Sequence, residues 1–124
     1  MTSKHRILVV DDDEAVLDFL NAKLGARYDI IATNAPERVL ALAREHRPNV
    51  IVCDVDMPEL DGGDVSRQLF DDPGVRDIPV LFLTALASPE DLKHLSGQLG
   101  GRPAVSKRAP IAELVARIER LTQP

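Results

Sequence analysis

The chain has 124 residues, with 15 basic and 20 acidic side chains, a formal net charge of −5 and one cysteine. This acidic balance argues against a direct nucleic-acid partner, and the length suits one domain, expected over residues 1–124 with a core at about residues 6–121. Apolar runs are far shorter than the about 18 residues of a membrane span, and the single Cys53 excludes an intramolecular disulfide, so we expect a cytoplasmic protein without a membrane segment.

The first part of the chain is expected to form two strand–helix units. Four apolar residues at 7–10 predict a buried strand, which is followed by four carboxylates at 11–14. Leucines at helical spacing then predict a helix over 15–24. A strand near an edge of the sheet is expected at 28–33, and a second helix over 36–47, with proline in its first turn.

The middle of the chain contains an apolar run that ends at a carboxylate. Residues 50–53 are all apolar and predict a strand buried on both faces, which ends at the carboxylate of Asp54. A short helix is expected around 65–70 after a glycine turn. Another apolar strand at 78–83 then leads to the hydroxyl of Thr84.

The last third of the chain adds two further units. A helix over 89–99 is expected to bury its three leucines along one face, and a weak strand at 103–106 ends at Lys107. The clearest amphipathic helix is predicted at 111–121. Five strand–helix units in succession predict an α/β fold, a doubly wound five-stranded parallel sheet with helices on both faces.

Polar side chains stand at the ends of four of the five predicted strands. Asp11 and Asp12 follow the first strand, Asp54 the third, Thr84 the fourth and Lys107 the fifth. Open α/β sheets bind ligands outside the carboxyl ends of their strands, so these side chains are expected to converge there. Two carboxylates about 4 Å apart repel by about 4 kcal/mol at an effective dielectric of about 20, so a cation is needed. Mg²⁺, a hard ion with oxygen ligands, is the cofactor that this set favours.

The same groups suit phosphoryl transfer to a carboxylate. Asp54 is the candidate nucleophile, which would form an acyl phosphate, while Thr84 and Lys107 would hold phosphate oxygens. Simpler roles stay open at this point: Asp11 and Asp12 as helix caps, Thr84 as a strand-ending hydroxyl and Lys107 as a surface lysine. Asp61 is expected to cap a helix rather than to bind a ligand.

Five short motifs follow one another along the chain: Asp11-Asp12, Asp54 with Met57-Pro58, Asp61-Gly62, Thr84-Ala85 and Lys107. Together they resemble the receiver domain of bacterial two-component response regulators. The resemblance runs from about Arg6 to Leu121 and implies a flavodoxin-like fold with strand order 2-1-3-4-5.

That resemblance also implies a role for each residue. Asp54 would accept a phosphoryl group from the phosphohistidine of a histidine kinase or phosphotransfer protein. Asp12, Asp54 and the backbone carbonyl of Asp56 would bind Mg²⁺, with Asp11 contributing through water, and Thr84 and Lys107 would contact the phosphoryl group. The chain would be a signalling switch rather than an enzyme, with intrinsic self-phosphorylation and self-dephosphorylation. Its further partners would be an effector and a second copy of the chain. The second copy would bind through the last helices and strand.

Two residues depart from the family pattern. Arg108 follows Lys107 where the family usually has proline after a cis peptide bond, and Ala104 stands where an aromatic switch residue is usual. Both favour an alternative, a pseudo-receiver that binds partners without phosphorylation. A less favoured alternative is a haloacid-dehalogenase-like phosphohydrolase that uses Asp54 and Asp56, which leaves the acidic pair after the first strand unexplained.

Overall fold

A computed structural model describes residues 4–57 and 60–123 of the chain. Its elements follow in the order β1 (Arg6–Val10), α1 (Glu14–Leu24), β2 (Asp29–Thr33), the 3₁₀ turn η1 (Pro36–Arg38), α2 (Val39–His46), β3 (Val50–Asp54), α3 (Gly62–Phe70), β4 (Val80–Thr84), α4 (Pro89–His94), β5 (Gln98–Leu99), β6 (Arg102–Ser106) and α5 (Ile111–Leu121). Among the described residues no helix is both long and apolar enough to cross a membrane.

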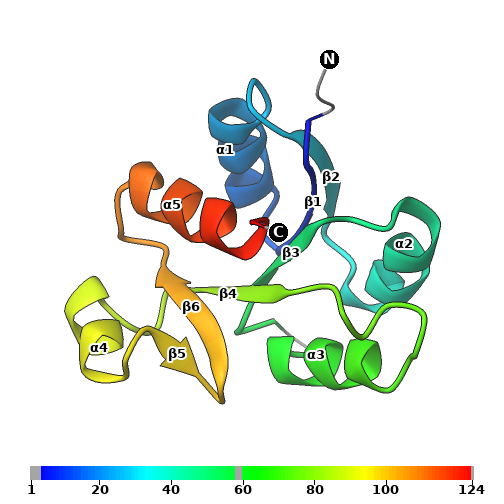
Figure 1. Cartoon of the computed structure of the whole chain (residues 1–124). Helices are drawn as coiled ribbons and strands as arrows, with labels where there is room; N and C mark the ends of the chain where they lie inside the picture. Colours follow the sequence, from blue (N-terminus) through cyan, green and yellow to red (C-terminus); the bar gives the residue numbers. More distant parts are fainter. Residues whose placement is uncertain (1–3, 58–59, 124) are drawn as a thin grey trace.

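The strands of the described residues form one six-stranded sheet in the order β2-β1-β3-β4-β6-β5 (Figure 1). All neighbouring pairs are parallel except β5 and β6, which are antiparallel. Since β6 is the fifth strand of the prediction, the parallel strands have the expected 2-1-3-4-5 order. The doubly wound α/β fold is confirmed, and the expected count of five strands is corrected to six by the short β5.

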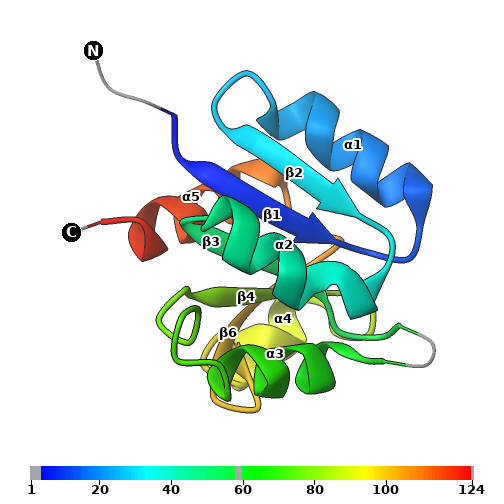
Figure 2. The same ribbon diagram turned by 90° about the vertical axis from the view of Figure 1, so that its right-hand side faces the viewer.

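Helices cover both faces of the sheet (Figures 1 and 2). Helices α1 and α5 pack on one face, and α2, α3 and α4 pack on the other. Along β3, Val50 and Val52 face the α1–α5 layer, whereas Ile51 and Cys53 face the opposite layer. This alternation is the reason why β3 needs an unbroken apolar run. Burial raises the pKa of the Cys53 thiol to about 12, so this cysteine is a protonated core residue at neutral pH, as predicted.

Helix α4 is shorter than predicted. It ends at His94 instead of continuing to residue 99. Leu92 is buried, but Leu95 is 51% exposed and Leu99 lies in β5. The prediction that all three leucines lie along one helical face is therefore wrong beyond the first of them.

Backbone angles explain both the early end of α4 and the extra strand. Ser96 and Gly97 have positive φ angles of 59° and 70°, which no α-helix can continue through. Gly100 and Gly101 also have positive φ, at 57° and 81°, as a two-residue hairpin turn requires. The Gly-Gly pair thus closes the β5–β6 hairpin.

Two acidic residues near the sheet edge cap helices, and for Asp61 this was predicted. The Asp13 carboxylate accepts from the N–H of Ala15 at 2.9 Å at the start of α1. Asp61 forms a capping box with Asp64 at the start of α3. A Cβ atom added at Gly62 would stand 2.8 Å from the carbonyl oxygen of Asp54. A residue without a side chain therefore lets α3 begin directly against the end of β3.

Candidate functional site

Three carboxylates meet at the carboxyl edge of the sheet. Asp11 and Asp12 directly follow β1, and Asp54 is the last residue of β3. Strands β1 and β3 are neighbours whose register pairs Val10 with Cys53, so the acidic residues that follow must lie side by side. Each of the three offers an oxygen, and these oxygens all lie within 4.8 Å of one another. Asp11 and Asp54 are buried, whereas Asp12 is exposed.

Lys107 extends into this cluster from the loop after β6. Its Nζ atom lies 2.7 Å from Asp11 Oδ2 and 3.3 Å from Asp54 Oδ1. The side chain of Lys107 is only 20% exposed, so it is not an ordinary surface lysine. None of the described peptide bonds is cis, and the ammonium group reaches both carboxylates although Arg108 replaces the usual proline.

Thr84 ends β4, which lies in the sheet between β3, the strand that ends at Asp54, and β6, the strand that Lys107 follows. Thr84 is buried at the end of β4. Its backbone carbonyl accepts from the N–H of Lys107 at 2.7 Å, and its Oγ1 accepts from the N–H of Leu86 at 3.0 Å. Because that Oγ1 accepts here, its own proton is available for donation to a bound group.

The other predicted ligand lies at the margin of the cluster. Asp56 is exposed, and its N–H donates to Asp54 Oδ1 at 3.4 Å, a long hydrogen bond. The use of its backbone carbonyl as a metal ligand stays a prediction. Pro58, part of the motif after Asp54, lies outside the described residues.

Two hydrogen bonds beside the site residues were not predicted from the sequence. The N–H of Asp13 donates to Asp11 Oδ1 at 2.9 Å, which holds one oxygen of that carboxylate. Ser106 is buried next to Lys107, and its Oγ accepts from the N–H of Arg108 at 3.1 Å. The sequence signal for the second contact is a hydroxyl residue two positions before a residue that is not proline.

Electrostatics within the cluster shift two pKa values. Burial and the negative charge of Asp11 raise the pKa of Asp54 to about 6, although the ammonium group of Lys107 opposes this shift. Burial by itself would lower the pKa of Lys107, but Asp11 and Asp54 leave it above its ordinary value. Lys107 is therefore charged at neutral pH, and Asp54 is mostly ionised there.

The charge balance of the site fits a divalent cation. Three carboxylates and one ammonium group leave an excess of two negative charges when all are ionised. Asp11 Oδ2 is buried and, apart from its ion pair with Lys107, makes no hydrogen bond of normal geometry. Clustered carboxylate oxygens are the ligands that Mg²⁺ prefers. The residues present therefore suit this ion.

Comparison with known proteins identifies the family. Residues 7–119 match the family model described as the response regulator receiver domain. The chain belongs to this family. It is thus a receiver domain of two-component signalling, which is a signalling domain rather than a classical enzyme. Receiver domains bind Mg²⁺ at an acidic pocket, and Asp11, Asp12 and Asp54 form such a cluster in this receiver.

Relatives of known sequence or structure extend over nearly the whole receiver. It is 41% identical to the response regulator PleD of Caulobacter vibrioides over 121 residues, or 95% of this chain. It is 32% identical to the polar-differentiation response regulator DivK of Brucella anthropi over 91% of this chain. The crystal structure of the Vibrio cholerae chemotaxis protein CheY4 superposes with a TM-score of 0.80 at 26% identity, covering 96% of this chain and 99% of CheY4.

These relatives differ in length from this receiver. The chain spans 26% of PleD but 92% of DivK. It also spans about half, 47%, of the probable transcriptional regulator ycf27 of Porphyridium aerugineum. The receiver module is therefore found in this family both within longer proteins and as most of a short one.

The raised pKa of Asp54 predicts a pH-dependent stability difference. A carboxyl whose pKa is higher in the folded protein than in the unfolded chain destabilises the fold when it ionises. The pKa of Asp54 is raised from 3.8 to about 6, so the effect is small near pH 4, grows between these two values and is complete above about 6. Without divalent ions, Asp54→Asn should increase the free energy of unfolding by about 1–3 kcal/mol at about pH 7.5 and by far less at about pH 4. Urea denaturation at both pH values measures this difference.

Asp77→Asn, a change of the same type at an exposed position, is the matched control and should alter neither value. Saturating Mg²⁺ should stabilise the wild type but not Asp54→Asn, because an ion that binds only the folded state raises its stability. Equal pH dependence in wild type and Asp54→Asn would contradict this description of the site.

Proposed function

We propose that this receiver is a phosphorylation-dependent switch in which Asp54 accepts a phosphoryl group with Mg²⁺. The observation that carries the proposal is the packing of buried Asp54 against Asp11 and the ammonium group of Lys107. A mostly ionised carboxylate beside a fixed cation is suited to attack phosphorus. We also propose that residues 1–124 form one receiver domain and that the protein is cytoplasmic.

The transfer uses the residues of the cluster in distinct roles. An oxygen of Asp54 forms a bond to phosphorus while the bond between phosphorus and the donor's imidazole nitrogen breaks, and the histidine leaves with that electron pair. Lys107 pairs with the phosphoryl oxygens, and Thr84 donates its hydroxyl proton to one of them. Self-phosphorylation from a small acyl phosphate follows the same route, with a carboxylate as leaving group.

Mg²⁺ would be held by Asp12 and Asp54, by the backbone carbonyl of Asp56 and, through water, by Asp11. When bound, the ion supplies positive charge that offsets the repulsion between these carboxylates and the incoming phosphoryl group. Asp12 is suited to the outer side of the site because it is the exposed member of the cluster.

The pseudo-receiver alternative was motivated by Arg108 and Ala104. The approach of Lys107 to both buried carboxylates favours phosphorylation over this alternative, since the amine is placed as a phosphoryl contact needs. Ala104 is small and buried, so an aromatic ring cannot relay the signal at this position. We propose that the loops after β4 and β6, which are joined by the hydrogen bond from Lys107 N–H to the Thr84 carbonyl, relay it instead.

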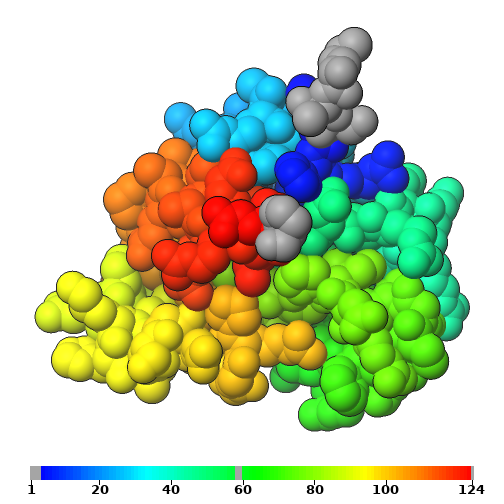
Figure 3. All heavy atoms as spheres, viewed as in Figure 1, coloured from blue at the N-terminus to red at the C-terminus, as the bar shows by residue number. Residues whose placement is uncertain are grey.

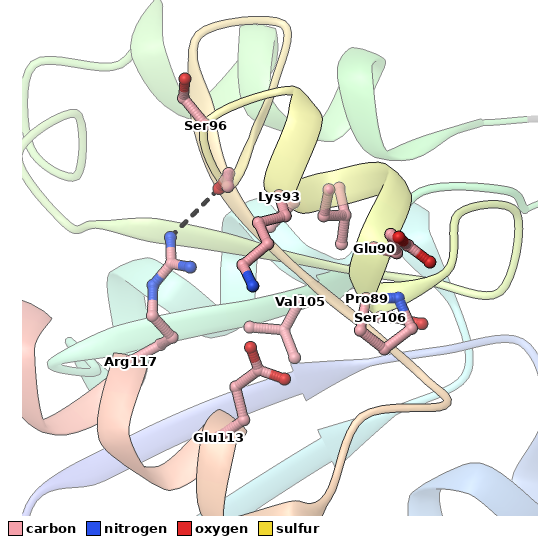
Figure 4. A pocket seen from close by; sticks show the side chains of 11 residues that line it. Pro89, Glu90, Lys93, Ser96, Val105, Ser106, Glu113 and Arg117 are labelled. Atoms are coloured by element: carbon pink, nitrogen blue, oxygen red, sulfur yellow. Dashed lines mark hydrogen bonds between the residues drawn. The ribbon is translucent and has the colours of Figure 1, made fainter.

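The proposed partners are a histidine kinase or phosphotransfer protein as donor, an effector as output, and a second copy of the chain. The second copy would use the surface of α4, β6 and α5, which is continuous from yellow to red in Figure 3. A groove of about 590 Å³ lies between α4 and α5, with β6 as its floor. Glu90 and Lys93 line it from α4, and Glu113 and Arg117 line it from α5 (Figure 4). A twofold axis can pair such opposite charges reciprocally.

Sedimentation velocity tests the homodimer. Phosphorylated wild type should form dimers at lower concentration than the unmodified protein, and Lys93→Glu should weaken this association roughly tenfold because it replaces an attractive pair by a repulsive one. Lys23→Glu on α1 is the matched control. A phosphorylated chain that stays monomeric at every concentration would exclude this partner.

Incubation with acetyl phosphate and Mg²⁺, followed by intact mass measurement, tests the proposed function. Wild type should gain a single adduct of about 80 Da, the mass of one phosphoryl group on a carboxylate. Asp54→Asn should gain none. Asp12→Asn should still be modified, but the Mg²⁺ concentration needed for half-maximal modification should rise at least roughly tenfold, because a metal ligand is lost. Asp77→Asn should behave as wild type.

The other outcomes of this experiment identify the alternatives. An unmodified wild type that still binds partners would support the pseudo-receiver. Continuous turnover of p-nitrophenyl phosphate, dependent on Asp54 and Asp56, would support the phosphohydrolase. A normal adduct in Asp54→Asn would refute Asp54 as the acceptor.

A further inference from the structure

The turn that follows β6 is closed by two hydrogen bonds to one residue. The N–H of Ala109 donates to the backbone carbonyl of Ser106 at 3.0 Å, and the N–H of Arg108 donates to Ser106 Oγ at 3.1 Å. Ser106 is only 3% exposed and pairs with Thr84 in the β4–β6 register. Its hydroxyl is therefore a buried acceptor within the backbone turn that carries Lys107.

These contacts hold the backbone of Lys107 from both sides. On one side, the N–H of Lys107 donates to the Thr84 carbonyl at 2.7 Å. On the other side, the next N–H along the chain is held by the hydroxyl of Ser106. A lysine side chain is long and flexible, so the direction of its first bonds decides where its ammonium group can reach. Here the ammonium group reaches Asp11 and Asp54.

The bond to Ser106 depends on the residue at position 108. Proline has no backbone N–H and could not donate to the serine hydroxyl. Arg108 supplies this donor through its backbone N–H. The chain thus combines a serine before the lysine with a residue after it that can donate, and the pair forms a local side chain–backbone motif.

We infer that Ser106 is a positioning residue: through the N–H of Arg108, its hydroxyl fixes the turn that aims Lys107 at Asp11 and Asp54. The inference about phosphorylation rates rests on the proposed function, whereas the inference about the position of Lys107 does not. A merely structural role for Ser106, as a satisfied hydroxyl at a strand end, would lower stability without an effect that depends on Lys107.

A double-mutant cycle separates these two roles. The initial rate of adduct formation from acetyl phosphate and Mg²⁺ is measured for wild type, Ser106→Ala, Lys107→Ala and the double variant, at a temperature where circular dichroism shows all four folded. Ser106→Ala should slow the reaction roughly fivefold, the effect of one lost hydrogen bond of ordinary net strength. In the Lys107→Ala background the same change should have no further effect, since the residue it positions is gone.

Two further variants complete this set. Ser106→Thr keeps the hydroxyl and should restore most of the rate. Ser66→Ala, which removes another buried serine hydroxyl on α3, should leave the rate unchanged. A Ser106→Ala rate equal to wild type, or the same fivefold loss with and without Lys107, overturns the inference.

A second readout does not need phosphorylation. The ¹H–¹⁵N signal of the Lys107 ammonium group, kept observable by its ion pairs, should broaden or vanish in Ser106→Ala and persist in Ser106→Thr and Ser66→Ala. An unchanged signal in Ser106→Ala overturns the inference whatever the rates are. A wild type without adduct contradicts the proposed function instead, and this signal then decides the role of Ser106 separately.

Discussion

Repulsion among three carboxylates, offset by one ammonium group, is the constraint on which this site depends. Burial and, after it, the negative charge of Asp11 raise the pKa of Asp54, which expresses the free-energy cost of ionising this carboxylate in the cluster. Lys107 reduces this cost without cancelling it. The remaining negative charge suits the site to a divalent cation, and the proposed phosphoryl transfer depends on that cation.

The topology of the sheet brings these like charges together. Parallel strands present their carboxyl ends at the same edge, and the β1–β3 register leaves no other place for the residues that follow Val10 and Cys53. The apolar faces of β1 and β3, buried under helices on both sides, keep the strands together despite the repulsion at their ends. Core packing therefore holds in place the charges on which the proposed function depends.

The sequence predicted those parts of the structure that depend on local pattern. Apolar runs predicted the parallel strands, and strand-end positions predicted that Lys107 and the three carboxylates meet. The end of α4 was missed because leucine spacing alone cannot distinguish a longer helix from a helix followed by a short strand. The positive φ of Ser96 could not be predicted either, because serine does not by itself favour that backbone conformation. The direction in which Lys107 points could not be derived either, because its backbone N–H is held by the Thr84 carbonyl, a contact that exists only once β4 and β6 are paired.

The central claim is that the carboxylates of neighbouring strands share one divalent ion. Anomalous scattering from crystals of the protein grown with Mn²⁺, which accepts the same oxygen ligands as Mg²⁺, tests it most directly. One strong anomalous peak should lie at bonding distance from oxygens of Asp12 and Asp54, with Lys107 still beside Asp11. An empty cluster at saturating Mn²⁺, or a peak bound elsewhere on the protein, would contradict it.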